Sequence, residues 1–363
     1  MDPKLLFQPQ RLVAALAIAS LTFGTPTTAF MAGSGLTPLK TLSTESSRHS
    51  CTLHVFGNNY LDFNHLSNDK TGGQSDFSAP GGQMGGSGNG RVPVIAGNWK
   101  LNPATVEEAS TLLSLLASNF LNHRGGIGEA APEVVVFPPF PYLERAMTLL
   151  EGTGIKVGAQ NVGVETKGAF TGEVSPSMVR SLGCDYVMVG HSERRTLFGE
   201  SDDTINSKIK LSLQEQGLKV ILCVGETLEE YENDLLSSVV SFQIKKALQG
   251  ISRDDIIDTV AIVPATRIVI AYEPVWAIGT GKVATPEQAQ IAHAVVRSTL
   301  QEMYGEDVAE KIQIQYGGSV TPDSISDLIS MPDVDGALVG GASLTADGFT
   351  RIVDGAAASL SPY

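Results

Sequence analysis

Four polar residues in this chain have the side chains needed to move a proton and to stabilise the charge that the move creates. A carboxylate can act as a general base, an imidazole can polarise a carbonyl, and an ammonium and an amide can stabilise developing negative charge. Each of these groups lies at, or just after, the end of a short apolar run. In chain order the four residues are Asn98, Lys100, His191 and Glu273.

Glu273 stands between a predicted strand and a loop. The β-branched run Ile268–Ile270 precedes it, Pro274 and Trp276 follow it, and a Gly-Thr-Gly string occupies positions 279–281. A carboxylate at the C-terminal end of a strand, followed by a loop that is stiff in the middle and pliable at one end, suits a base beneath a closing lid. Taken alone, the segment is equally compatible with an ordinary turn that carries a solvated glutamate.

His191 follows the apolar run Tyr186–Val189 and directly precedes a helical pattern. At that position an imidazole can meet a substrate, although a satisfied core histidine is the alternative. The other histidines after residue 90 are His123, in a loop rich in Gly and Asn, and His293, in mid-helix among Ala and Val. We expect both of these to be structural or solvated.

From Arg91 onward, short apolar runs alternate with amphipathic stretches. Eight strand–helix units in about 270 residues match a single (β/α)8 barrel of the α/β class. A doubly wound sheet is the competing fold, but its first turn would be expected to be rich in Gly, and Asn98–Asn102 is not. The expected strands are Val92–Asn98, Val134–Phe137, Lys156–Gln160, Tyr186–Val189, Lys219–Val224, Ile268–Ala271, Ile312–Tyr316 and Gly336–Val339, and the expected helices include Asn102–Phe120, Asp202–Gln216 and Pro286–Tyr304.

Local signals mark where the helices begin. Thr285 is followed by Pro286 and, three residues on, by Gln288, which predicts a capping box with Pro at the first helical position. Ser201, followed by Asp202 and Asp203, opens another helix, and Gly217 lies just past the end of that helix. In the stretch 232–266 we expect an extended helix and a surface loop.

Five strings, in order and with compatible spacing, resemble the triosephosphate isomerase family over about residues 91–359. The resemblance implies an enzyme that interconverts dihydroxyacetone phosphate and D-glyceraldehyde 3-phosphate through an enediolate, in glycolysis, gluconeogenesis or the Calvin cycle, without a cofactor or metal. A non-catalytic barrel that binds sugar phosphates or a protein, and a different barrel enzyme acting on phosphorylated sugars, are the alternatives. The strings are Gly97–Lys100, Gly190–Arg195, Tyr272–Trp276, Tyr316–Ser319 and Leu338–Ser343.

The resemblance also implies a role for each polar residue. Glu273 is the base, and burial would give its carboxylate the raised basicity required. His191 is the neutral electrophile, whose pKa a helix N-terminus would lower. Lys100 and Asn98 stabilise the phosphate and the enediolate, and Glu193 orients Lys100 by ion pairing.

Phosphate recognition is expected from backbone N–H groups after the last two strands, where barrels of this kind often hold phosphate. Glycine at these positions lets the main chain approach the substrate closely. The residues expected to bind the substrate phosphate are Gly279, Ser319, Gly340 and Gly341.

The loop Lys167–Glu173 resembles the family's protruding loop, which reaches into a partner subunit. An exposed Phe170 in a polar loop is otherwise hard to justify. The resemblance therefore implies a homodimer in which Phe170 and Thr171 lie near the active site of the neighbouring subunit.

Composition narrows the possible partners. The chain has 363 residues, 42% hydrophobic and 18% charged, with a net charge of −14. Residues 1–90 hold five residues of each sign, so the whole excess lies on residues 91–363. Such an acidic domain would repel phosphate backbones, which argues against nucleic acid and anionic membranes. Cys51, Cys184 and Cys223 have no metal-ligand spacing, and we expect the last two to be buried thiols.

The first ninety residues read as a leader. Residues 1–29 resemble a signal peptide, because a basic start precedes the apolar stretch Leu12–Phe23 and small residues precede Phe30. Residues 30–90 are rich in Ser, Thr, Gly and Asn, and we expect a disordered transit-like or linker segment. This order resembles the leader of plastids of secondary algal origin, although acidic residues weaken that interpretation. Mitochondrion, cytosol and secretion are the alternatives, and no membrane association is expected of the mature form.

Overall fold

The computed structural model describes residues 91–123, 131–258, 265–278 and 284–360. The predictions about residues 1–90, including the leader and Cys51, lie outside the described residues, and so does Gly279. Within the described part, no helix is both long enough and apolar enough to cross a membrane.

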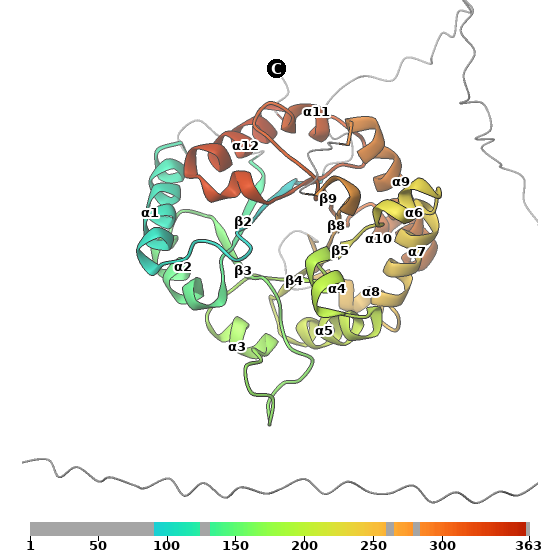
Figure 1. Ribbon diagram of the computed structural model, residues 1–363, viewed down its shortest axis with the longest axis horizontal. Coiled ribbons are helices and arrows are strands. Elements are labelled where there is room, and N and C mark those ends of the chain that lie inside the picture. The colour runs from blue at the N-terminus through green and yellow to red at the C-terminus, as the bar shows by residue number, and fades with distance from the viewer. Residues whose placement is uncertain (1–90, 124–130, 259–264, 279–283, 361–363) are drawn as a thin grey trace, which may run out of the picture. The chain divides into compact units, whose positions relative to one another are not determined.

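Eight parallel strands close into a barrel, and helices surround it (Figure 1). Around the barrel the order is β1-β10-β9-β8-β5-β4-β3-β2, so that β1 pairs with both β10 and β2. This is the predicted (β/α)8 architecture. The barrel strands are β1 (Val94–Asn98), β2 (Glu133–Phe137), β3 (Lys156–Ala159), β4 (Tyr186–Val189), β5 (Lys219–Val224), β8 (Ile268–Tyr272), β9 (Ile314–Tyr316) and β10 (Gly336–Val339).

Each strand buries both of its faces, which explains the continuous apolar runs. Alternate side chains point into the barrel, where Phe137, Met188 and Leu338 belong to one buried cluster. The residues between them point outward and pack against the helices, as Ile95 and Val136 do. The inner cluster fills the interior of the barrel. A site can therefore form above this cluster, at the carboxyl ends of the strands.

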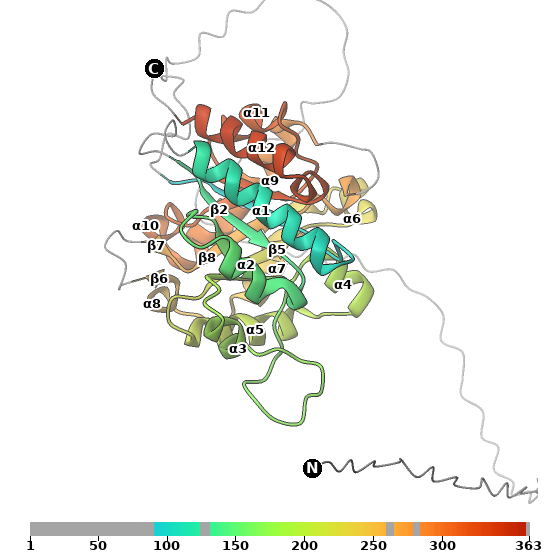
Figure 2. The ribbon, with the colours of Figure 1, turned by 90° about the vertical axis from the view of Figure 1, so that its left-hand side faces the viewer.

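The outer layer consists mainly of helices that follow the strands. In Figure 2, α1 and α2 lie in front of the barrel strands, on the side that faces the viewer. The α-helices are α1 (Val106–His123), α2 (Leu143–Leu149), α3 (Pro176–Ser181), α4 (Ser192–Phe198), α5 (Asp202–Gln214), α6 (Leu228–Glu232), α7 (Leu236–Ala247), α8 (Arg253–Ile256), α9 (Pro286–Tyr304), α10 (Glu306–Ala309), α11 (Ile325–Ile329) and α12 (Ala346–Ala358). Single 3-10 turns are η1 (Phe140–Tyr142), η2 (Val275–Ala277) and η3 (Gly341–Leu344).

Helix α9 begins and ends as predicted. The Thr285 hydroxyl accepts a bond from the Gln288 N–H at 3.2 Å, and the Gln288 side chain accepts one from the Thr285 N–H at 2.9 Å. The prediction for the first helix was wrong at its start, because α1 begins four residues later than Asn102. Thr105 and Glu108 cap one another there, and each accepts the other's backbone N–H at 3.2 Å. That reciprocal pair fixes the start of the helix at Val106.

The long segment 232–266 contains more structure than an extended helix and a loop. Helix α7 is followed by the short α8 and then by an antiparallel pair, β6 (Ile257–Asp258) and β7 (Ala265–Thr266). Ile257 pairs with Thr266 in this small sheet, which is separate from the barrel. Two-residue strands are too short for any alternation of apolar and polar residues to reveal them.

The buried groups predicted to be structural are structural. Cys184 and Cys223 are free, buried thiols, and burial raises the pKa of Cys184 to about 11. His293 is fully buried in α9, with Nδ1 2.9 Å from the Asp333 carbonyl oxygen. Burial lowers the pKa of His293 to about 4, so its ring is neutral at pH 7.

Candidate active site

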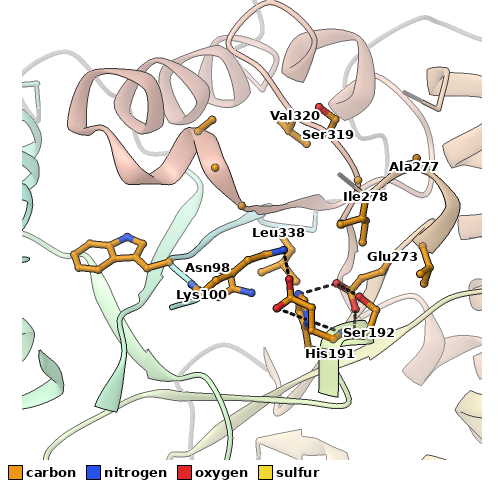
Figure 3. Close-up of a pocket in the computed structure, with 18 of the residues that line it drawn as sticks. Asn98, Lys100, His191, Ser192, Glu273, Ala277, Ile278, Ser319, Val320 and Leu338 are labelled. Atoms are coloured by element: carbon orange, nitrogen blue, oxygen red, sulfur yellow. Dashed lines mark hydrogen bonds and ion pairs between the residues drawn. The ribbon is translucent and has the colours of Figure 1, made fainter. Parts of the chain in front are cut away.

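The predicted site residues converge at the carboxyl ends of the barrel strands. They line one cavity of about 750 Å³, part of which Figure 3 shows. Those that line it are Asn98, Lys100, His191, Glu193, Glu273, Ser319, Gly340 and Gly341. Phe170 and Thr171 are not among the lining residues.

Strand register brings Glu273 to the cavity. Tyr272 of β8 pairs with Val224 of β5, and the Glu273 N–H continues that ladder by donating to the Val224 carbonyl at 2.8 Å. The neighbouring Gly317 has to be a glycine, because a Cβ there would lie 2.9 Å from Cγ of Glu273. Glu273 is therefore fixed by its strand and is almost fully buried, at 2% exposure.

The Glu273 carboxylate contacts the start of helix α4. Its Oε1 lies 2.9 Å from Nε2 of His191, and its Oε2 accepts the Ser192 backbone N–H at 2.8 Å (Figure 3). The Ser192 hydroxyl lies 3.4 Å from Oε1. An ionised carboxylate and the N-terminus of a helix stabilise each other, so this position favours the charged base.

The other ring nitrogen of His191 determines its tautomer. Nδ1 accepts the Glu193 backbone N–H at 3.2 Å, which requires a lone pair on Nδ1. The proton of the neutral ring is then on Nε2, which is the nitrogen that faces Glu273 and the cavity. Gly190, with φ of +75°, makes the turn before His191, and a Cβ there would lie 3.2 Å from the Cys223 carbonyl.

The predicted pKa directions of this pair were wrong, because the two side chains contact each other. Burial raises the pKa of Glu273, but the adjacent His191 and the Ser192 N–H lower it by more, so its pKa lies below the ordinary value. Burial lowers the pKa of His191, but the Glu273 and Glu193 carboxylates together raise it by more. The bond from the Glu193 N–H opposes that rise, since it forms only with an unprotonated Nδ1. In this arrangement Glu273 is ionised at neutral pH.

Lys100 has the expected ion pair and an unusual backbone. Its Nζ lies 2.7 Å from Oε1 of Glu193, as predicted. Its φ of 53° is in the left-handed region, which costs a non-glycine residue about 1–3 kcal/mol. Asn98 Oδ1 accepts the Lys100 N–H at 2.9 Å, and Gln160 Nε2 donates to the Lys100 carbonyl at 2.8 Å. Gln160, which we did not predict, thus helps to hold the backbone that presents the lysine.

The comparisons with known proteins agree with this geometry. A family model described as triosephosphate isomerase matches residues 93–356. The chain belongs to the triosephosphate isomerase family. Membership confirms the predicted enzyme class, an isomerase of glycolysis.

Three relatives named triosephosphate isomerase illustrate the similarity. The protein of Carboxydothermus hydrogenoformans is 49% identical over 265 residues, which cover 73% of this chain and 99% of the relative. That of Roseiflexus sp. (strain RS-1) is 49% identical over 264 residues, covering 72% and 97%. That of Clostridium tetani is 50% identical over 264 residues, covering 73% and 96%. Almost the whole length of each relative thus aligns with this chain.

One more buried carboxylate in this isomerase escaped prediction. Glu226, which follows β5, accepts the Tyr272 hydroxyl at 2.9 Å and the Trp276 indole N–H at 2.8 Å on the same oxygen. Burial raises the pKa of Glu226. Its partners lie on both sides of Glu273 in the sequence, so it attaches the segment around the base to the neighbouring strand. Nothing in the sequence around Glu226 signals that contact.

Proposed function

We propose that Glu273 transfers the proton in the interconversion of dihydroxyacetone phosphate and D-glyceraldehyde 3-phosphate. The carboxylate takes a proton from C1 of the ketose, and the C–H electron pair forms the enediolate double bond. The same carboxyl group returns a proton at C2, while the proton of the C1 hydroxyl passes to the C2 oxygen and C1 becomes the aldehyde carbonyl. Every transfer is a proton transfer, so the reaction needs no cofactor.

The observation that best supports this proposal is the direct contact of Glu273 with Nε2 of His191 in the cavity that Lys100 also lines. A substrate oxygen would replace the carboxylate as the acceptor of the Nε2 proton. The pKa of Glu273 would then rise, since the imidazole is the main group that lowers it and burial, the largest influence, raises it. Binding of substrate would thus produce the basicity that the reaction needs.

His191, Lys100 and Asn98 would stabilise the enediolate. The neutral Nε2–H group donates to the developing oxyanion, and the Lys100 ammonium offsets its charge. Ser319, Gly340 and Gly341, which line the same cavity, would bind the phosphate. Replacing Glu273 with Gln tests this mechanism directly, because it removes the proton acceptor and preserves the shape of the side chain.

We further propose that the active form is a homodimer. The segment between β3 and α3 extends away from the barrel (Figures 1 and 2). Phe170 within it is 46% exposed, and Leu101 and Leu197, near the cavity, are 93% and 73% exposed. Exposed large apolar side chains such as these are typical of an interface between subunits.

The variant Phe170→Asp is expected to dissociate this dimer. Truncation of a buried interface aromatic typically costs about 2 kcal/mol or more, which is roughly a 30-fold weaker association. Sedimentation velocity over a dilution series measures the change, and turnover should fall as monomer appears. Phe242→Asp is the matched control, because Phe242 is 58% exposed on α7. Equal effects of the two variants, or none, would contradict the proposed interface.

We also propose that residues 1–29 and 30–90 direct the protein to a plastid of secondary origin, where the reaction would serve the Calvin cycle. The family match begins at residue 93, so the leader precedes the region shared with the relatives. A fusion of residues 1–90 to a fluorescent protein, expressed in an alga with such plastids, should accumulate there. Fluorescence in mitochondria or the cytosol would overturn this localisation.

A further inference from the structure

The ring of Tyr231 contacts the segment that follows Glu273. It stacks on the indole of Trp276, with ring centroids 4.4 Å apart and an angle of 23° between the planes. Tyr231 belongs to α6, outside the barrel, and is partly buried against the core. Trp276 belongs to η2, three residues after Glu273, and is only 7% exposed. Stacked aromatic pairs of this kind fix the plane of each ring.

The hydroxyl of Tyr231 contacts a second segment. Gln288 Nε2 donates to it at 3.1 Å. The same Gln288 side chain accepts the Thr285 N–H at 2.9 Å and so completes the capping box of α9. Tyr231 therefore contacts residues on both sides of positions 279–283: Trp276 through its ring, and the start of α9 through its hydroxyl.

Trp276 determines where one wall of the cavity lies. Its neighbours Val275, Ala277 and Ile278 line the cavity, and Figure 3 shows Ala277 and Ile278 beside Glu273. The indole N–H bond to Glu226 holds one edge of the Trp276 ring. The stack on Tyr231 covers one face of the same ring and fixes its plane.

We propose that Tyr231 is a positioning residue that holds the wall of residues 275–278 over the reacting carbons through Trp276. This rests on the proposed role of Glu273 as the base. A displaced wall would admit water to the enediolate, which can then expel its phosphate. In that side reaction the C3–O bond breaks, the enediolate electron pair forms a new C=C bond, and inorganic phosphate leaves with the bonding pair. A three-carbon ketoaldehyde remains after tautomerisation, and no oxidant or reductant is needed.

The test compares Tyr231→Leu with Tyr231→Phe in the full chain. Leu removes both the stack and the hydroxyl bond, whereas Phe keeps the stack. For Tyr231→Leu we expect kcat/KM to fall about 3- to 10-fold, the range for loss of one aromatic pair. We also expect more inorganic phosphate released per isomerisation. Tyr231→Phe should release no more phosphate per turnover than the unmodified enzyme.

Phosphate released per turnover does not depend on how much of a variant is folded, so lower stability alone would leave this ratio unchanged. Trp276→Leu, alone and combined with Tyr231→Leu, provides a double-mutant cycle. If Tyr231 acts through Trp276, the double variant should be little worse than Trp276→Leu alone. An unchanged phosphate ratio in Tyr231→Leu, or fully additive effects, would overturn the inference. Failure of the mechanism itself would be distinct, because Glu273→Gln would then remain active.

Discussion

Replacing Glu273 with Gln is expected to lower kcat at least about 10²- to 10⁴-fold, the usual contribution of general acid–base catalysis. The amide fills the same space and its oxygen can still accept the Ser192 N–H, which donates to the carboxylate at 2.8 Å. It cannot take a proton from carbon. Because the loss is chemical and not structural, we expect folding and phosphate binding to survive.

Turnover is measured by coupling formation of dihydroxyacetone phosphate to its reduction. Incorporation of deuterium from D2O into the product gives a second reading, since a proton held by a carboxyl group exchanges with solvent. Glu133→Gln is the matched control, because Glu133 begins β2 at the opposite end of the barrel and contacts Tyr186 and Lys219. Near-normal turnover of Glu273→Gln would refute the assignment of the base. An unmodified protein that binds phosphate but lacks turnover would favour a non-catalytic barrel.

The strands were predictable from the sequence because the barrel buries them on both faces. Strand β5 is an example. Its residues Val220–Val224 form one uninterrupted apolar run after Lys219, and all of them are buried. The start of α1 was not predictable from the hydrophobic pattern alone, because the spacing of apolar and polar residues is compatible with a helix from Asn102 onward. Mutual capping of Thr105 and Glu108 decided it.

The membership of the site was predictable, but its electrostatics were not. Strand ends and motif strings identify Glu273 and His191, yet only the fold shows that they lie 2.9 Å apart, and that contact reverses both expected pKa shifts. Gln160 was missed for a similar reason. Its partners are the carbonyl groups of Phe137 and Lys100, which lie 23 and 60 residues away in the sequence and leave no trace in its neighbours.

Replacing Lys100 with Met is expected to lower kcat/KM about 10²- to 10³-fold, the usual effect of removing one group that stabilises an oxyanion. Among the described residues that line the cavity, Lys100 is the only lysine or arginine, while Glu193 and Glu273 line it too. The chain has a net charge of −14, so its general field opposes an anionic substrate. In the Lys100→Met variant, no lysine or arginine in the described cavity wall offsets the repulsion between the acidic chain and the substrate. The enediolate also loses its nearby positive charge.

Lys156→Met separates this local effect from the change in net charge. Lys156 begins β3, is partly exposed and pairs with Asp185 at 3.5 Å, and it does not line the active-site cavity. Both variants make the chain more acidic by one charge, so an effect of the general field would lower kcat/KM equally in both. We expect Lys156→Met to stay close to the unmodified enzyme. We expect the kcat/KM of Lys100→Met, relative to that of the unmodified enzyme, to rise as salt is added, because both proteins keep the repulsion that salt screens but only the unmodified enzyme has the Lys100 attraction to lose. Equal losses in the two lysine variants would show that net charge, and not the position of Lys100, governs the reaction.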